Sequence, residues 1–298
     1  MTDTTVERTP AFRAVWREQL HVVGLSIRRE AVLTAMLLGL FCVAAVVTAR
    51  VPAVSTWLGG DFANFRLDPA EPGFGLIGVF AALLFPLLVW KGERPFGDTP
   101  IWSLPVDHRR HALTKVAAGW VWLMVFLVGA LLSVVLATLA GGGALGVDEV
   151  RQLLIDPAGF PGPGATGATR AVSWTTPWWE WVLPFTSATA AYLLASALLL
   201  ATAYPFRWAV VLFVLTQVSV EIITSEYVQI GWLRRAVDLV EWFVGGEDFV
   251  TYVRLPTTRF TRAWVLLPSV GMWVASAAFW ISLGFACVVA ASSRARDH

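Results

Sequence analysis

The first long apolar stretch is Ala31–Ala49, which reads AVLTAMLLGLFCVAAVVTA and contains no charged residue. A helix of about 20 apolar residues crosses the hydrocarbon core of a bilayer, which is about 30 Å thick. Five similar stretches follow along the chain: Gly73–Trp90, Val116–Ala140, Trp181–Ala203, Trp208–Thr224 and Trp264–Ser292. Glu221 is the one charged residue within these six stretches. The pattern predicts about six membrane-spanning helices.

The composition also favours an all-α, polytopic membrane protein. Of the 298 residues, 57% are hydrophobic and 14% are charged, whereas soluble domains usually carry about 25% charge. Because lipid cannot satisfy backbone hydrogen bonds, each apolar stretch must be helical, and the stretches are too long for the strands of a barrel. A soluble protein with six buried helices is the alternative, but too little polar chain remains to cover them. We therefore treat residues 1–298 as a single transmembrane domain.

The distribution of positive charge predicts the orientation. With the N-terminus inside, segments 1–30, 91–115, 204–207 and 293–298 contain 13 arginines and lysines, and the longer outer loops contain nine. An excess of these residues marks the cytoplasmic side of a membrane protein. We expect a multi-pass protein of the cell membrane with both termini in the cytoplasm. The last outer loop, with five arginines, runs against this trend.

Two segments outside the predicted spans have helical apolar stripes. In the first, the N-terminal segment 1–30 contains a stripe formed by Phe12, Val15, Trp16, Leu20, Val23 and Ile27. It predicts a helix on the inner membrane surface, with a plain cytosolic extension as the alternative. In the second, apolar residues at 230, 233, 237, 240 and 244 predict an amphipathic helix on the outer face.

The outer segment 141–177 contains a Gly-Gly-Gly run and the sequence Pro161-Gly-Pro-Gly164, a composition typical of a flexible loop. It leads into tryptophans at 174, 178, 179 and 181. Tryptophans in such a position usually form an aromatic belt at the membrane interface, although they could also stack on a ligand.

The sequence lacks the motifs of several enzyme classes. It contains no P-loop, no H-E-x-x-H and no G-x-S-x-G, so we expect no catalytic residues and no ATP site in this chain. The four histidines lie outside the spans, and Cys42 and Cys287 have no metal-ligand spacing, so we expect neither haem nor another metal cofactor. No basic run could follow a nucleic acid backbone.

The inner segment 91–115 differs from an ordinary connecting loop because it places apolar residues between charged ones. These apolar residues are Phe96, Ile101, Trp102, Leu104 and Val106. Exposed apolar groups bordered by charge usually mark a protein contact, although this loop could instead pack on its own bundle or lie in the headgroups. Pro105 would end a helix here and Asp107 could cap the next one. A short helix docked on a partner could transmit motion to the span that follows it.

The same segment has an ordered set of residues that matches a known pattern. An acidic residue leaves the second span, a Gly-Thr region and a Leu-Pro-Val element follow, and basic residues and a lysine lead into the third span. The matching residues are Glu93, Gly97, Thr99, Leu104, Pro105, Val106, Arg109, Arg110 and Lys115. Trp102, an apolar residue of the same loop, is a further candidate for the coupling contact. This segment resembles the cytosolic loop of ABC-2-type transporter permeases. Pro95, Asp98 and Pro100 depart from the pattern of that family.

The resemblance implies that the chain is the permease subunit of an ATP-driven transporter. A separate ATP-binding cassette ATPase would bind ATP and Mg²⁺ and contact the 91–115 loop. A second permease chain, identical or similar, would complete the path for the substrate. The alternatives are a non-transporting membrane scaffold or assembly subunit and a secondary transporter. A secondary transporter should show internal repeats and several intramembrane acids, and the sequence shows neither.

Glu221 is a candidate for the translocation path. It follows Trp208 by thirteen residues, which places it about 20 Å from the inner end of its helix. Gln217 lies one turn before it and Ser225 one turn after it, with Thr224 alongside, so the four form a polar stripe that would face a bundle or a water-filled path. The alternative is that Glu221 reaches the outer headgroups or pairs with an arginine such as Arg234 or Arg262.

Overall fold

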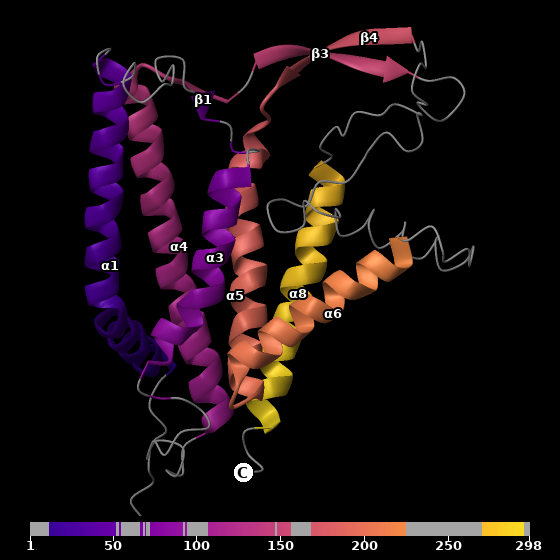
Figure 1. Cartoon of the computed structure of the whole chain (residues 1–298). Helices are drawn as coiled ribbons and strands as arrows, with labels where there is room; N and C mark the ends of the chain where they lie inside the picture. Colours follow the sequence, from indigo (N-terminus) through magenta and orange to yellow (C-terminus); the bar gives the residue numbers. More distant parts are fainter. Residues whose placement is uncertain are drawn as a thin grey trace, which may run out of the picture.

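The computed structural model describes residues 12–51, 54, 66–67, 69, 72–91, 93, 107–146, 148–155, 168–224 and 270–294. These residues are mostly helical (Figure 1). The helices are α1 (Phe12–Arg50), α3 (Pro72–Val89), α4 (His108–Gly141), α5 (Leu183–Ala201), α6 (Pro205–Thr224) and α8 (Val270–Arg294). A 3-10 helix, η3 (Trp178–Val182), leads directly into α5.

Each predicted apolar stretch falls on one of these helices, as far as the described residues extend. Four helices in this part of the chain are long and apolar enough to cross a membrane: Arg13–Arg50, His108–Gly141, Trp178–Ala201 and Trp273–Ser293. Within α3, Ile77–Val89 forms a shorter apolar helix. The structure therefore supports a helical membrane protein with four such helices, and the larger number of six stays a prediction.

Helix α1 joins two elements that the sequence predicts separately. The predicted surface helix and the first span are continuous over Phe12–Arg50, and Figure 1 shows the N-terminal part bending towards the lower parts of the neighbouring helices. Val23 and Ile27 are buried there, and Trp16 and Leu20 pack against the same core. Much of the predicted apolar stripe is thus covered by other helices of this chain.

The main partner of α1 is α4, which runs in the same direction. At the end of the bundle that the charge bias predicts to be cytoplasmic, called the inner end below, the indole N–H of Trp122 donates to Leu20 O over 3.0 Å, and Gly24 leaves space for the ring. At the outer end, Arg50 Nε donates to Ala140 O over 2.8 Å. This carbonyl belongs to the last turn of α4, where helical carbonyls lack a partner and favour a cation. Both ends of the α1–α4 pair are therefore fixed by hydrogen bonds.

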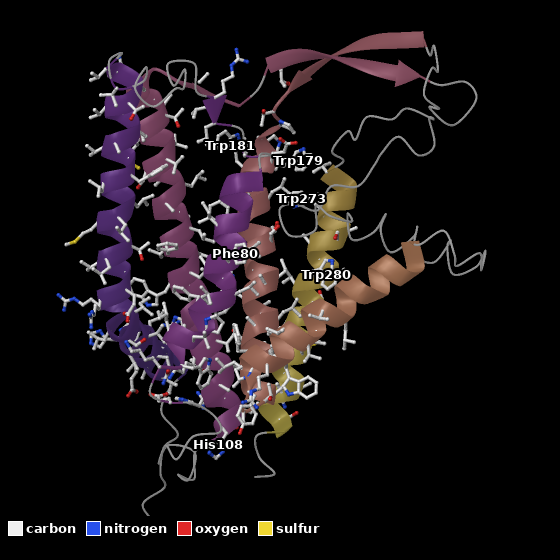
Figure 2. All side chains as sticks on the ribbon, in the orientation of Figure 1. Phe80, His108, Trp179, Trp181, Trp273 and Trp280 are labelled. Atoms are coloured by element: carbon white, nitrogen blue, oxygen red, sulfur yellow. The ribbon has the colours of Figure 1, made fainter. Side chains whose placement is uncertain are left out.

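Helix α5 is the centre of the bundle because it packs extensively on both α3 and α8. Tyr192 on α5 is fully buried and donates from Oη to Val116 O on α4 over 2.8 Å. A Cβ at Gly119 would meet the Tyr192 hydroxyl and lie 2.7 Å from Val89 Cγ2, so only glycine fits this crossing without displacement. At the outer end, Trp179 stacks on Trp273 of α8 with ring centroids 5.5 Å apart (Figure 2). Trp179 thus packs inside the bundle, while Trp178 is exposed, as an interfacial belt requires.

The described residues are mostly helical, as predicted, but segment 141–177, predicted as a loop, contains strands. Strands β3 (Asp148–Ile155) and β4 (Ala168–Thr175) form an antiparallel pair in which Asp148 lies opposite Thr175 and Ile155 opposite Ala168. The two strands flank the Pro-Gly run and contain residues that favour strands, such as Val150, Ile155 and Val172. The glycines and prolines between them led to the prediction of a loop for the whole segment. A second, parallel pair joins β1 (Arg66–Leu67) to β2 (Ala144–Leu145). The predicted outer helix around 230–244 lies outside the described residues.

The outward side of the bundle is apolar. On α1, Met36, Leu37, Leu40 and Phe41 are each about two-thirds exposed. On α6, neighbouring residues such as Phe206, Trp208, Val210, Val211 and Leu212 are exposed on all sides of the helix. Figure 1 shows the lower end of α6 beside α5 and the rest running obliquely away from the bundle. Apolar side chains in this arrangement suit a lipid environment or contact with another apolar surface.

Candidate functional site

The end of α3 and the start of α4 flank, in sequence, the loop that is predicted to be a docking element. Two backbone hydrogen bonds form a turn directly after α3. Trp90 N–H donates to Pro86 O over 2.9 Å, and Glu93 N–H donates to Trp90 O over 3.1 Å. This turn brings Glu93 back towards the helices. The described chain resumes at Asp107, directly before α4, so both ends of the loop are placed by regular structure.

Helix α4 begins with the predicted cap. Asp107 Oδ1 accepts from Arg110 N–H over 3.4 Å, and Asp107 O accepts the first helical hydrogen bond from His111 N–H over 2.9 Å. The prediction that Asp107 caps this helix is confirmed. The cap fixes where α4 begins. His111 and Lys115 lie on the same side of this helix because they are one turn apart. Figure 2 labels His108 at this lower end of α4.

The side chains at this end form a compact cluster of Trp90, Glu93, His111 and Lys115. Lys115 Nζ makes an ion pair with Glu93 Oε2, and His111 Nε2 lies 3.6 Å from the same oxygen. The ammonium also lies over the Trp90 ring, 4.8 Å from its centroid, and His111 meets that ring edge-on at 6.4 Å. We call these four residues the loop-base cluster.

Burial makes the loop-base cluster energetically sensitive. The side chain of Lys115 is 2% exposed and Trp90 is 1% exposed, whereas the Glu93 side chain is 22% exposed. A buried ammonium loses its hydration, which costs several kcal/mol unless a counter-charge and a polarisable ring compensate. Glu93 and Trp90 supply both. His111 and Lys115 hold the pKa of the Glu93 carboxyl at about 2, although partial burial acts in the opposite direction.

A second ion pair joins α1 to the same region. Lys91 Nζ donates to Glu30 Oε1 over 2.9 Å. Both side chains are partly exposed, so the pair adds little stability. Its effect is geometric, because it places Glu30, near the middle of α1, beside Lys91, two residues after the end of α3. The loop base is thus linked to α1, α3 and α4.

The structure brings together only part of the predicted site. Glu93 and Lys115 meet directly, Arg109 is exposed, and the backbone of Arg110 takes part in the cap. The predicted contact residues Gly97, Thr99, Trp102, Leu104, Pro105 and Val106 lie outside the described residues. The candidate path residues Gln217, Glu221 and Thr224 are on α6. The sequence analysis missed Trp90 and His111, although the one-turn spacing of His111 and Lys115 was a usable signal.

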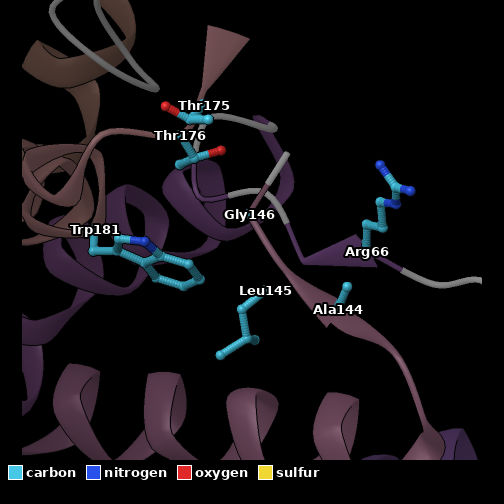
Figure 3. Close-up of a pocket in the computed structure, with 7 residues that line it drawn as sticks. All are labelled: Arg66, Ala144, Leu145, Gly146, Thr175, Thr176 and Trp181. Carbon is cyan, nitrogen blue, oxygen red and sulfur yellow. The ribbon is translucent and has the colours of Figure 1, made fainter. Parts of the chain in front are cut away.

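An open pocket of about 590 Å³ lies at the opposite, outer end of the bundle (Figure 3). It is lined by Arg66, Ala144, Leu145, Gly146, Thr175, Thr176 and Trp181. The parallel β1–β2 pair forms one wall, and the entry to η3 forms another. Its polar groups come from one exposed arginine and two threonines. Within the described residues, no three His, Cys, Asp or Glu side chains gather as metal ligands would.

Comparison of the chain with protein-family models, with curated proteins and with solved structures finds no match. The resemblance to ABC-2-type permeases therefore rests on the residues of the 91–115 loop and on the arrangement of the apolar stretches.

Proposed function

We propose that this chain is the permease subunit of an ATP-driven transporter and that its 91–115 loop docks on a separate ATP-binding cassette ATPase. The observation that carries the proposal is the loop-base cluster. It joins the turn after α3 to the first turns of α4 at the base of a loop rich in apolar residues. The separate Lys91–Glu30 pair links this base to α1, so a force on the loop would reach all three helices.

The rest of the proposed arrangement follows from the chain's apolar surface and charges. The six apolar stretches and the charge bias of the sequence support six spans, with both termini and the 91–115 loop in the cytoplasm. ATP and Mg²⁺ belong to the partner ATPase, since this sequence has no P-loop. A second permease chain would cover apolar side chains that are exposed on α6. The polar stripe of Gln217, Glu221 and Thr224 is the proposed lining of the path.

The proposal is tested by recovery of the partner. An affinity-tagged full chain should co-purify with a cassette ATPase from its native membranes. Leu104→Asp and Trp102→Asp should each reduce recovery of the ATPase at least about tenfold, because an unpaired carboxylate in an apolar contact costs several kcal/mol. Ser103→Asp is the matched control, since it adds the same charge at a polar position of the same loop.

Two results would contradict the proposal. The first is that no cassette ATPase accompanies the wild-type chain, which would favour the scaffold function. The second is that both aspartate variants retain the ATPase at full strength and keep its activity, in which case the loop is not the docking element.

A further inference from the structure

The turn between α5 and α6 lies at the inner end of the bundle, the same end as the start of α4 (Figure 1). Helix α5 ends at Ala201 and α6 begins at Pro205. Thr202 Oγ1 accepts from Tyr204 N–H over 3.1 Å, and Trp208 N–H donates to Tyr204 O over 3.2 Å. These hydrogen bonds hold the connection and the first turn of α6 in one arrangement.

Helix α5 places this turn at the depth of lipid headgroups. Leu183–Ala201 contains 19 residues. At 1.5 Å per residue, α5 is therefore about 28 Å long, close to the hydrocarbon core of about 30 Å. Trp178, at the start of η3, is 74% exposed at the outer end, as a residue of the outer interface would be. The residues that follow Ala201 thus leave the hydrocarbon core at the opposite interface.

Large amphipathic side chains are exposed at this depth. Tyr204 is 60% exposed, Phe206 is 76% exposed and Trp208 is 53% exposed. The Arg207 guanidinium lies over the Tyr204 ring, 4.8 Å from its centroid. Tyrosine and tryptophan concentrate at membrane interfaces because the ring is apolar while its O–H or N–H reaches water, and arginine extends a charged head from an apolar stem. We call Tyr204, Phe206, Arg207 and Trp208 the aromatic turn.

The exposed rings of the aromatic turn do not share one face. Phe206 and Trp208 are two positions apart in α6, so they project about 160° away from each other. A protein docked on one side of α6 would cover one of these rings and leave the other exposed. A headgroup layer surrounds the helix and contacts both. The arrangement therefore favours lipid over a docked protein as the partner.

We propose that the aromatic turn binds the phospholipid headgroup layer at the inner interface of the membrane and fixes the depth at which α6 begins. The rings of Tyr204 and Trp208 lie at the boundary between headgroups and acyl chains, and Arg207 contacts phosphate. Within the described residues, α6 packs mainly on α5. The aromatic turn thus supplies positioning that neighbouring helices do not. This inference does not depend on an ATPase partner.

A spin label beside the aromatic turn measures its depth. The full chain carries Cys42→Ala, Cys287→Ala and a nitroxide on Ala209→Cys, an exposed position one residue beyond Trp208. It is reconstituted in vesicles of phosphatidylcholine and phosphatidylglycerol. Collision rates of the nitroxide with oxygen, which concentrates in the hydrocarbon core, and with a water-soluble nickel chelate report the depth.

Two reference positions calibrate the measurement. Gly39→Cys lies near the middle of the first apolar stretch, and nothing lies within 4 Å of its Cβ position, so it reports the hydrocarbon core. Arg109→Cys is exposed at the start of α4 and reports water. We expect the oxygen-to-nickel ratio at position 209 to lie between the two references. A ratio equal to either reference would overturn the proposal. So would low rates with both quenchers, because they show that a protein covers the turn.

Substitutions test whether the rings set this depth. The variant Y204S/W208S should shift the ratio towards the aqueous reference, since serine has no apolar ring, and the exchanged pair Y204W/W208Y should keep the parent value. The control F285S removes a ring that is 57% exposed on α8 and should leave the ratio unchanged. An unchanged ratio in the serine variant, or an equal shift in the control, would contradict the proposal. If the serine variant does not fold, the parent ratio against the two references decides.

Discussion

Glu93 and Lys115 lie 22 positions apart and form an ion pair across the base of the inner loop. The two partners differ in exposure, since Lys115 is nearly inaccessible and Glu93 reaches solvent. This difference means that the pair is not symmetric: the lysine depends on the glutamate more than the glutamate depends on the lysine.

The first prediction follows from that asymmetry. Glu93→Gln should lower the free energy of unfolding by about 3 kcal/mol, because it leaves a buried ammonium without its counter-charge. Lys115→Met should cost roughly 1 kcal/mol, since methionine can pack on Trp90 and Glu93 can turn to water. The measurement is the unfolding of each purified variant in detergent micelles. Equal costs for the two variants would show that burial does not govern the pair.

The second prediction concerns acid. The pKa of Glu93 is lowered from 4.5 to about 2 by His111 and Lys115, which face it, so its protonation favours the unfolded chain. The contribution of Glu93 to stability should be complete above pH 4.5 and should disappear as the pH falls towards 2. Thermal unfolding midpoints across this range measure the effect. The Glu93→Gln variant should have a flatter acid profile, and a profile identical to that of the parent would contradict the assignment.

The third prediction concerns the crossing of α4 with α5. Gly119→Ala should destabilise the protein by about 2 kcal/mol or more, because the new methyl group would meet Tyr192 Oη and Val89. Gly129→Ala on the same helix is the matched control, since nothing lies within 4 Å of its Cβ position. Tyr192→Phe should partly rescue Gly119→Ala by removing the hydroxyl. Unfolding midpoints of the four proteins decide the question, and equal effects at positions 119 and 129 would refute it.

The fourth prediction tests the orientation. In a chain whose two native cysteines are replaced by alanine, Asp98→Cys should be protected from membrane-impermeant maleimide in intact cells, and Gly164→Cys should be labelled. The reason is that the charge bias places the 91–115 loop inside and the 141–177 segment outside. Labelling at both positions, or at neither, would exclude the six-span arrangement.

The fifth prediction concerns Glu221. If it lines a path, Glu221→Gln should change the ATPase activity of the purified complex while the yield of folded complex stays the same. If it pairs with an arginine instead, the yield should fall and should recover when Arg234 or Arg262 is also replaced by glutamine. Size-exclusion chromatography and ATP hydrolysis separate the two outcomes. Normal yield with normal activity would exclude both roles.

The helices were the most predictable part of the fold. Long uncharged stretches such as Ala31–Ala49 and Val116–Ala140 satisfy their own backbone only as helices, so local sequence was sufficient. The ends were less predictable. The apolar stripe before residue 31 predicted a helix, but not its continuity with the first span or its packing on the bundle around Val23, which depend on tertiary contacts. Strands β3 and β4 were missed because the intervening glycines and prolines dominated the interpretation of that loop.

The candidate site was predictable in its residues but not in its contacts. The positions of Glu93 and Lys115 at the two ends of the loop predicted both as site residues, and the Asp107 cap followed from the residue preferences of helix N-termini. The position of Trp90 beneath the ammonium could not be predicted, because it depends on how the turn after α3 meets the first turns of α4. Such a contact between segments distant in sequence leaves no periodic signal.

The pairing of α1 with α4 also constrains how the protein is made. The Cys42 thiol donates to Ser133 O, 91 residues later in the chain. Arg50 likewise donates to Ala140 O, which is synthesised 90 residues after it. At a synthesis rate of about 5–20 residues per second, the first helix exists for several seconds before its partner leaves the ribosome. During that interval lipid or the insertion machinery must shield the side of α1 that later packs on α4.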